Sequence, residues 1–310
     1  MNLNKPAFWD LKNFIIWPIL LLPITFLYSL ILFIKRIVSV EKKLNIKVIC
    51  IGNIYIGGTG KTPLTIKIAS LLRGKMKIAV VKKEYSYLQD EILLLKKNCK
   101  VFVNKSRRLA IQQAINEGYD LVILDDGFQD MTIKKDLSII CFSSKQGIGN
   151  GFTFPSGPLR ESLARLKYAD MVFINGDLNP ELEKKIKLYN KYLEVFYSRY
   201  SILDIKKYNS KKYFAFSGIG NNINLLNLLK KNKINVVDHK FFPDHYSYNE
   251  SDINSLKEKA KKNNLQLLTT EKDFLRLDDV AKKDIEYVNT ELIINNEERL
   301  MKKIIFYENN

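Results

Sequence analysis

A glycine-rich turn near residue 60 carries the clearest chemistry in this chain. Its members are Tyr55, Ile56, Gly57, Gly58, Thr59, Gly60, Lys61 and Thr62. Backbone N–H groups of such a turn converge on a polyphosphate, the lysine adds positive charge, and the threonine hydroxyl reaches Mg²⁺. The strict pattern requires glycine where Tyr55 stands, but the three following glycines still permit positive φ and close backbone approach. The turn predicts a nucleoside triphosphate site; the alternative is a strand-to-helix turn with a surface lysine.

Two adjacent carboxylates form the second chemical feature. Asp125 and Asp126 directly follow the apolar run Leu121–Leu124. In a fold with a phosphate-binding turn, an aspartate at such a strand end reaches Mg²⁺ or its water shell beside the triphosphate. Neighbouring like charges repel, and a bound dication would offset the repulsion between these two carboxylates. The alternative is an acidic turn that ends a strand.

A later glycine-rich loop, residues 149–161, leads into a segment whose pattern predicts a helix over 158–166. Arg160 is a candidate phosphate ligand, and Glu161 is a candidate member of the metal environment. From spacing alone, helix capping and surface ion pairing explain these two residues equally well.

Only two histidines, His239 and His245, are available as a catalytic base. His245 is the stronger candidate because it lies in the aromatic-rich turn Phe-Phe-Pro-Asp-His-Tyr, and a neutral imidazole there can accept a proton from a hydroxyl group. The alternative is a purely structural histidine.

Alternating apolar runs and helical patterns predict the elements that position these residues. Strands are expected over 47–51, 77–81, 101–103, 121–124, 137–142 and 171–174, with helices over 61–72 and 106–117. This βαβ rhythm predicts an α/β fold with a P-loop NTPase-like parallel sheet covered by helices. We expect a kinase core over 41–205 and a smaller C-terminal α/β subdomain over 206–310, with a strand over 213–216 and a helix over 297–306.

The N-terminal segment, residues 1–40, is predicted to be a membrane anchor. No charged residue occurs from Phe14 to Ile34, a length sufficient to cross a hydrocarbon core. Lys35 and Arg36 follow, so the positive-inside bias predicts the inner membrane with the catalytic part facing the cytoplasm. A buried core helix and a helix lying in the membrane interface are the alternatives.

Composition narrows the class of protein. The chain has 310 residues, of which 46% are hydrophobic, and a formal net charge of +17. This hydrophobic content excludes a disordered protein. The charge suits phosphate or an anionic membrane, but no nucleic-acid-binding motif accompanies it, and we expect no nucleic-acid partner. The three cysteines are too far apart to indicate a disulfide framework or a zinc site.

Several motifs in order resemble those of the tetraacyldisaccharide 4′-kinase family. They are Gly52-Asn53 with 57–63, Asp-Asp-Gly-Phe-Gln at 125–129, Gly-Asn-Gly at 149–151, Gly-Pro-Leu-Arg-Glu at 157–161, Phe-Ser-Gly-Ile-Gly-Asn at 216–221, Phe-Pro-Asp-His at 242–245 and Thr-Thr-Glu-Lys-Asp at 269–273. Each motif alone is weak, but their joint occurrence in this order is specific.

The resemblance implies an ATP- and Mg²⁺-dependent lipid kinase. Its substrate would be the 4′-hydroxyl of a tetraacylated disaccharide 1-phosphate, and its product lipid IVA, on the way to lipid A. The family's catalytic dyad maps onto Asp90 and His245, with Lys61 stabilising the transferring phosphoryl group and Mg²⁺ held by Thr62 with Asp125 or Asp126.

The chain departs from the family pattern in a shortened stretch before Asp90, in Ser156 where alanine is common, and at two further places. Lys83-Glu84-Tyr85 replaces the usual Arg-Gly-Tyr, and Asp130 replaces the histidine that usually follows Phe-Gln. The alternatives to an active lipid kinase are a membrane-anchored P-loop ATPase and a catalytically weakened relic of the family. A GTPase would need a guanine-reading Asn-Lys-x-Asp segment, and the sequence contains none.

Overall fold

The computed structural model describes residues 5–10, 16–85 and 88–309, which divide into two units. The larger unit comprises Lys5–Lys83, Cys99–Arg199 and Ile294–Asn310, and the smaller comprises Glu84–Asn98 and Tyr200–Ile293. The boundary predicted near residue 205 lies close to Tyr200, but the units are not contiguous in sequence. Helix α4 (Gln89–Asn98) belongs to the smaller unit because it packs on α9 (Glu271–Phe274), and the C-terminal segment returns to the larger one.

The larger unit is built around an eight-stranded sheet. Its strands are β1 (Lys47–Gly52), β2 (Ile78–Lys83), β3 (Val101–Asn104), β4 (Leu121–Asp125), β5 (Leu137–Ser143), β6 (Met171–Asn175), β7 (Glu194–Ile202) and β12 (Thr290–Ile294). They follow the order β12-β7-β6-β5-β1-β4-β2-β3, and every neighbouring pair from β3 to β7 is parallel. Because β1 and β4 are neighbours, the glycine-rich turn and the carboxylate pair leave the sheet at the same edge.

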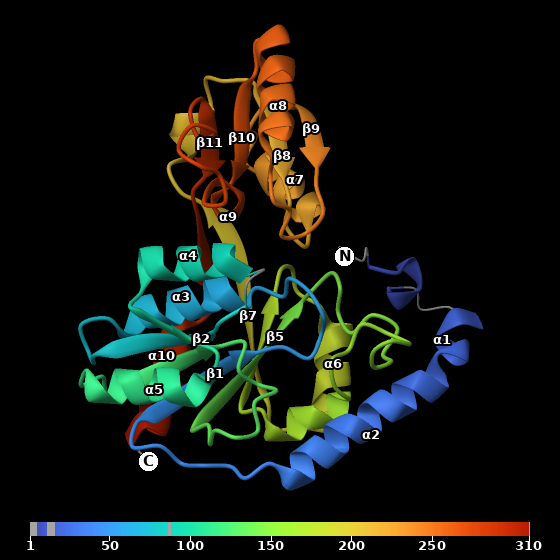
Figure 1. Ribbon diagram of the computed structural model, residues 1–310, viewed down its shortest axis with the longest axis vertical. Coiled ribbons are helices and arrows are strands. Elements are labelled where there is room, and N and C mark those ends of the chain that lie inside the picture. Colours follow the sequence, from blue (N-terminus) through green and yellow to red (C-terminus); the bar gives the residue numbers. More distant parts are fainter. Residues whose placement is uncertain (1–4, 11–15, 86–87, 310) are drawn as a thin grey trace. The chain divides into compact units, whose positions relative to one another are not determined.

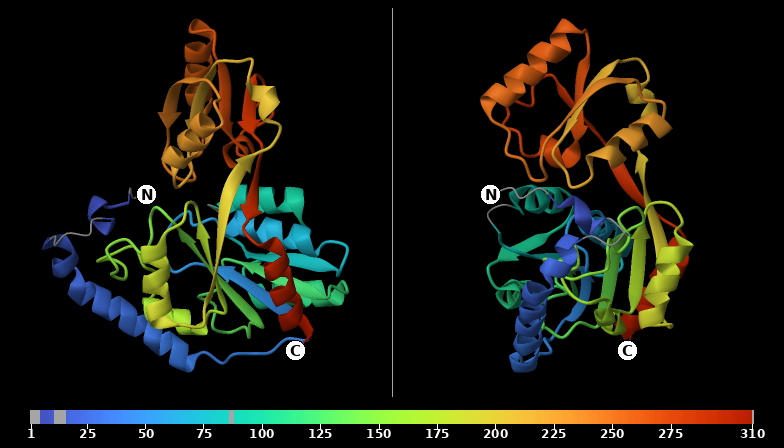
Figure 2. Two further views of the ribbon diagram at one scale, coloured as in Figure 1. Left: turned by 180° about the vertical axis from the view of Figure 1, so that it is seen from behind. Right: turned by 90° about the vertical axis from the view of Figure 1, so that its right-hand side faces the viewer.

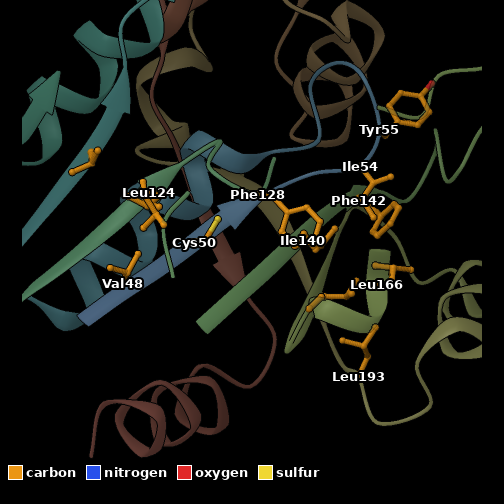
Figure 3. Close-up of a cluster of buried hydrophobic side chains, with 14 of the residues drawn as sticks. Val48, Cys50, Ile54, Tyr55, Leu124, Phe128, Ile140, Phe142, Leu166 and Leu193 are labelled. Carbon is orange, nitrogen blue, oxygen red and sulfur yellow. The ribbon is translucent and has the colours of Figure 1, made fainter. Parts of the chain in front are cut away.

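Helices cover this sheet, as the alternation of apolar segments predicts. They are α3 (Lys61–Leu72), α5 (Arg107–Asn116), α6 (Pro180–Tyr189) and α10 (Glu297–Asn309), with a 3-10 helix η3 at Leu163–Tyr168 (Figure 1). Alternate residues of the central strands, such as Val48, Cys50 and Leu124, join residues of α5, α6 and η3 in one buried cluster (Figure 3). The intervening residues Ile49, Ile51 and Ile123 are also buried, so both faces of these central strands are apolar, which is typical of a covered parallel sheet.

The smaller unit has its own sheet of four parallel strands. These are β8 (Tyr213–Ser217), β9 (Val236–Phe241), β10 (Gln266–Thr270) and β11 (Ile285–Val288), in the order β11-β10-β8-β9. Tyr213 and Ala215 pack with α7 (Asn222–Lys231), whereas Phe214 and Phe216 pack with α8 (Glu250–Lys262). Since successive strand residues point to opposite faces, α7 and α8 cover opposite faces of this sheet (Figure 2). The mainly parallel α/β fold predicted from the sequence is confirmed.

The N-terminal segment differs from the predicted single anchor helix over 14–34. Residues 14 and 15 lie outside the described residues. Before them the chain forms the short 3-10 helix η1 (Ala7–Trp9), and after them it forms α1 (Ile16–Leu20) and α2 (Leu22–Val38). A new helix starts at Leu22 because Pro23 suits a first helical turn but cannot continue an earlier helix. Within the described ranges, no helix is both long and apolar enough to cross a bilayer.

Local predictions succeeded where one pattern dominated. The helices predicted at 61–72 and 106–117 are α3 and α5, with Ser106 as the N-cap residue of α5. The helix predicted over 158–166 is wrong at its start. There Leu159 forms bridges with Tyr55 and Thr153, and the Arg160 N–H donates to the Ile54 carbonyl, so this backbone is used by loop contacts and only η3 is helical.

Candidate active site

The turn between β1 and α3 has the backbone form of a phosphate cradle. Gly57 and Gly60 have φ of 115° and 89°, a region that favours glycine. A Cβ at Gly60 would lie 2.4 Å from Nδ2 of Asn175, so a side chain there would also have to displace that amide. The Asn53 amide braces the turn by donating to the Tyr55 carbonyl at 2.6 Å and to Oγ1 of Thr59 at 3.1 Å. The sequence motif contained Asn53 without indicating this role.

Tyr55 occupies the position where the strict pattern has glycine, and the structure shows why it is tolerated. Its φ is not positive, and its ring is fully buried in the core of the larger unit (Figure 3). The phenol donates to Asp10 at 2.8 Å and also contacts Lys5, and burial together with Asp10 raises its pKa. The buried ring of Tyr55 therefore anchors the start of the turn in the core, and the glycines with positive φ follow it in the chain.

The two carboxylates at the end of β4 lie beside this turn but have different surroundings. Asp125 is fully buried; its Oδ2 accepts from Thr62 Oγ1 at 3.0 Å, and its Oδ1 accepts from Thr65 Oγ1 at 3.1 Å. Asp126 has a φ of 61°, which turns its side chain out of the strand direction. The sequence-predicted trio of Thr62, Asp125 and Asp126 is thus brought to one end of the larger unit.

Basic side chains converge on Asp126. Arg160 donates to both of its carboxylate oxygens, at 3.0 and 3.1 Å, and Lys61 Nζ lies 3.8 Å from Oδ1. Burial alone would raise the pKa of this carboxyl, but Lys61, Arg160 and Lys82 outweigh burial and hold it well below its ordinary value. The predicted phosphate-binding residues Lys61 and Arg160 therefore lie together, and Asp126 stays ionised at neutral pH.

Glu161 has a different environment from the one its predicted metal role requires. Its Oε2 accepts from Arg165 Nε and from Arg36 of α2, each at 3.0 Å. Its side chain is only 4% exposed, and two guanidinium groups neutralise it. The structure places Glu161 in an ion-pair network that ties α2 to the 153–161 loop, which is the ordinary pairing that the sequence left open.

The oxygen donors Thr62, Asp125 and Asp126 fit Mg²⁺, which prefers a few protein oxygens together with water and nucleotide phosphate. Among the described residues, no group of three His, Cys, Asp or Glu side chains forms a self-contained metal site. A hard cation held mainly by a triphosphate is consistent with both observations.

A second cluster lies within the smaller unit and contains the predicted catalytic pair. Asp90, in the first turn of α4, lies 3.0 Å from Nδ1 of His245 through Oδ2 and 3.1 Å through Oδ1. His245 has a φ of 56°, and its N–H donates to the Gly218 carbonyl at 3.1 Å. Two residues 155 positions apart in the sequence are thus brought together, and the left-handed backbone conformation of His245 directs its imidazole toward Asp90.

Two cations near this pair were not predicted from the sequence. Arg276 Nε donates to Asp90 Oδ2 at 2.9 Å, and its other nitrogens donate to the carbonyls of Tyr246 and Gly218. Lys272 Nζ lies 3.4 Å from His245 Nε2 and 3.4 Å from Asp90 Oδ2. Arg276 belongs to no motif, and only the fold brings it to Asp90.

The charge state of Asp90 determines what the pair can do. Burial would raise the pKa of Asp90, but its bond with His245 and the charges of Lys272 and Arg276 hold it well below the ordinary value. An ionised Asp90 accepts a hydrogen bond from Nδ1–H, so Nε2, which lies 3.4 Å from Lys272 Nζ, is the ring nitrogen that can act as a base.

The position occupied by Asp130 also has a structural explanation. Its carboxylate accepts from Arg107 at 3.2 Å and from the Thr132 hydroxyl at 2.7 Å. Arg107 also donates to the Asp126 carbonyl at 2.5 Å. Asp130 therefore holds an arginine that supports the backbone beside the Asp125–Asp126 pair.

Comparisons with known proteins agree along the whole chain. The family described as LpxK, tetraacyldisaccharide-1-P 4′-kinase, matches residues 17–89 and 82–306. A tetraacyldisaccharide 4′-kinase of Pelagibacter ubique (strain HTCC1062) is 42% identical over 309 residues, and one of Rickettsia bellii (strain OSU 85-389) is 34% identical over 323; each match covers 98% of both chains. The crystal structure of the "apo" form of LpxK from Aquifex aeolicus in complex with ATP superimposes with a TM-score of 0.73 at 24% identity, covering 94% of this chain and 99% of that one.

Proposed function

The chain belongs to the tetraacyldisaccharide 4′-kinase family, and we propose that its two side-chain clusters divide the reaction between them. It is a lipid A 4′-kinase, an enzyme that transfers the γ-phosphate of ATP to the 4′-hydroxyl of a tetraacyldisaccharide 1-phosphate to give lipid IVA. In our proposal the larger unit holds the triphosphate, and the smaller unit activates the hydroxyl. The observation that carries the second part is the 3.0 Å contact between Asp90 and His245.

In the larger unit, the N–H groups of the glycine-rich turn and the N-terminus of α3 bind the phosphates, with Lys61 beside them. Lys61 and Arg160 both form ion pairs with Asp126, and their positive charges stabilise the negative charge of the phosphoryl group during its transfer. Thr62, Asp125 and Asp126 would hold Mg²⁺, which when bound neutralises charge on the β- and γ-phosphates.

In the smaller unit, His245 Nε2 accepts the proton of the sugar hydroxyl as its oxygen attacks phosphorus. Asp90 keeps the Nδ1 proton in place and stabilises the imidazolium that forms, while Arg276 fixes the carboxylate. Because Asp90 is 3% exposed, water screens this charge interaction little. The pair thus has the partners that a general base requires.

We also propose that the protein lies on the cytoplasmic face of the inner membrane through α1 and α2. Large apolar side chains are exposed along both helices; Trp17, Phe26 and Ile37 are 58%, 72% and 67% exposed. Exposed apolar area of this extent is unfavourable in water and suits the boundary between headgroups and acyl chains. Lys35 and Arg36 in the last turn of α2 add attraction to anionic lipids.

One side of α2 is fixed to the larger unit. Thr25 Oγ1 donates to Ser156 Oγ at 2.7 Å, the Tyr28 hydroxyl donates to the Arg160 carbonyl at 3.0 Å, and Arg36 contacts Glu161. In our proposal this attachment keeps the catalytic part close to a substrate whose acyl chains stay in the leaflet.

Two experiments test these assignments. Lys61→Ala should abolish phosphoryl transfer to the disaccharide and weaken ATP binding, whereas Lys67→Ala on the same helix should retain both. Equal activity of the two variants would refute the nucleotide assignment.

The wild-type protein should co-sediment with vesicles that contain anionic lipid, and the double variant Phe26→Asp/Ile37→Asp should remain in the supernatant. Unchanged sedimentation of that variant would exclude α2 as the membrane contact.

A further inference from the structure

A lysine is buried at the metal end of the nucleotide site, and no motif accounts for it. Lys82, near the end of β2, is aligned with Asp125 across the β2–β4 pair. Its Nζ lies 2.7 Å from Asp125 Oδ2, and the two side chains are 2% and 0% exposed. A buried ion pair contributes little net stability compared with apolar residues of similar size, so stability alone does not explain the lysine.

The contacts of Asp125 show what the lysine does to this carboxylate. Oδ2 accepts from Lys82 and from Thr62, and Oδ1 accepts from Thr65. Donors from the protein thus already engage both oxygens, and the ammonium neutralises the charge. A dication that approaches Asp125 must compete with a resident cation.

The charges around the site lead to the same conclusion. Three cations, Lys61, Lys82 and Arg160, contact two carboxylates, Asp125 and Asp126. The excess positive charge favours a polyphosphate and opposes a dication that arrives alone. Removing the Lys82 charge would cancel this excess, with the largest effect at Asp125.

We propose that Lys82 is a positioning residue for the kinase reaction: its ammonium holds Asp125 against Thr62 and suppresses binding of a free divalent cation, so that the cation enters together with the triphosphate. The proposal rests on the proposed nucleotide role of this site. It assigns a function to a residue that the sequence presents only as part of a strand.

The test compares Lys82→Gln and Lys82→Met with Thr65→Val. Glutamine retains a donor without a charge, methionine removes the donor as well, and Thr65→Val removes a neutral donor from the same carboxylate. Binding of Mn²⁺ to the nucleotide-free protein is measured by electron paramagnetic resonance. We expect both Lys82 variants to bind Mn²⁺ about tenfold or more tightly than wild type, and Thr65→Val to stay within about threefold.

A second measurement covers the case in which loss of the ion pair impairs folding. Thermal unfolding in EDTA and with Mn²⁺ should show a larger metal-induced rise in Tm for the Lys82 variants than for wild type, and a variant that folds only with Mn²⁺ supports the proposal. ATP affinity in EDTA should fall about tenfold in the same variants.

Mn²⁺ affinity and metal-induced Tm shifts equal to or below those of wild type would overturn the proposal and leave Lys82 with a structural role only. These readouts do not depend on turnover. Failure of the proposed function would instead appear as a wild-type protein that does not bind ATP.

Discussion

The pairing of Asp90 with His245 predicts that these two residues act as one catalytic unit. His245→Ala removes the group that takes the hydroxyl proton, and loss of a general base typically lowers kcat about 10²–10⁴-fold, or about 2.7–5.5 kcal/mol. Asp90→Asn leaves the imidazole but removes a carboxylate 3.0 Å from Nδ1 in a site where Asp90 is 3% exposed. We expect about a 10²–10³-fold loss from this variant.

The double variant distinguishes a coupled pair from two separate effects. Because the carboxylate acts through the imidazole, Asp90→Asn should have little further effect when His245 is already alanine. The assay is transfer of label from γ-labelled ATP to the disaccharide 1-phosphate, with ATP affinity measured in parallel and expected to be unchanged in all three variants.

Two controls accompany this cycle. His239→Ala replaces the other histidine, which is exposed on β9, and should leave kcat unchanged. Thermal unfolding checks that Asp90→Asn, which also loses the Arg276 contact, remains folded at the assay temperature. Normal turnover of His245→Ala, or fully additive losses in the double variant, would refute the assignment of the pair.

Further predictions follow from charge and burial. The folded-state pKa of Asp90 lies below its unfolded value, so its contribution to stability is complete above about pH 4 and is lost as pH falls through the folded pKa; Asp90→Asn should flatten the pH dependence of urea unfolding below pH 4. Burial raises the pKa of Cys50 to about 12 and that of Cys99 to about 11, so both should react slowly with a thiol reagent at pH 8 in the folded protein and rapidly in denaturant. Arg165→Met removes the more buried of the two guanidinium groups that pair with Glu161, and Arg36→Met removes the one that is 32% exposed. Because Glu161 keeps one partner in each variant, the first should lower the free energy of unfolding by about 1.5–3 kcal/mol and the second by less than about 1 kcal/mol.

The sequence predicted those parts of the molecule that local patterns determine. Helix α3 begins at Lys61, directly after the glycine-rich turn, and α5 begins at Arg107, at the start of the helical pattern over 106–117. The helix predicted over 158–166 failed because the Pro158 carbonyl accepts from the Ile56 N–H and the Arg160 N–H donates to the Ile54 carbonyl, and these partners are distant in sequence.

The candidate site shows the same division. Lys61, Thr62 and the Asp125–Asp126 pair lie within recognisable motifs, and the structure brings them together. Arg276 and Lys82 belong to no motif, and their roles follow only from contacts with carboxylates far along the chain; Lys272 lies within a motif, but the motif alone did not indicate its contact with Asp90. Glu161 illustrates the opposite case, in which a motif residue is engaged by the arginines of its own network.

As a member of its family, this chain should phosphorylate the sugar hydroxyl of an acylated disaccharide with ATP. The most direct measurement is mass spectrometry of the lipid after the purified protein is incubated with ATP, Mg²⁺ and the tetraacyldisaccharide 1-phosphate in mixed micelles. We predict a product heavier by one phosphate, carried on the 4′ oxygen of the distal sugar, and no such product with Lys61→Ala. Release of inorganic phosphate from ATP with the disaccharide recovered unchanged would contradict the account.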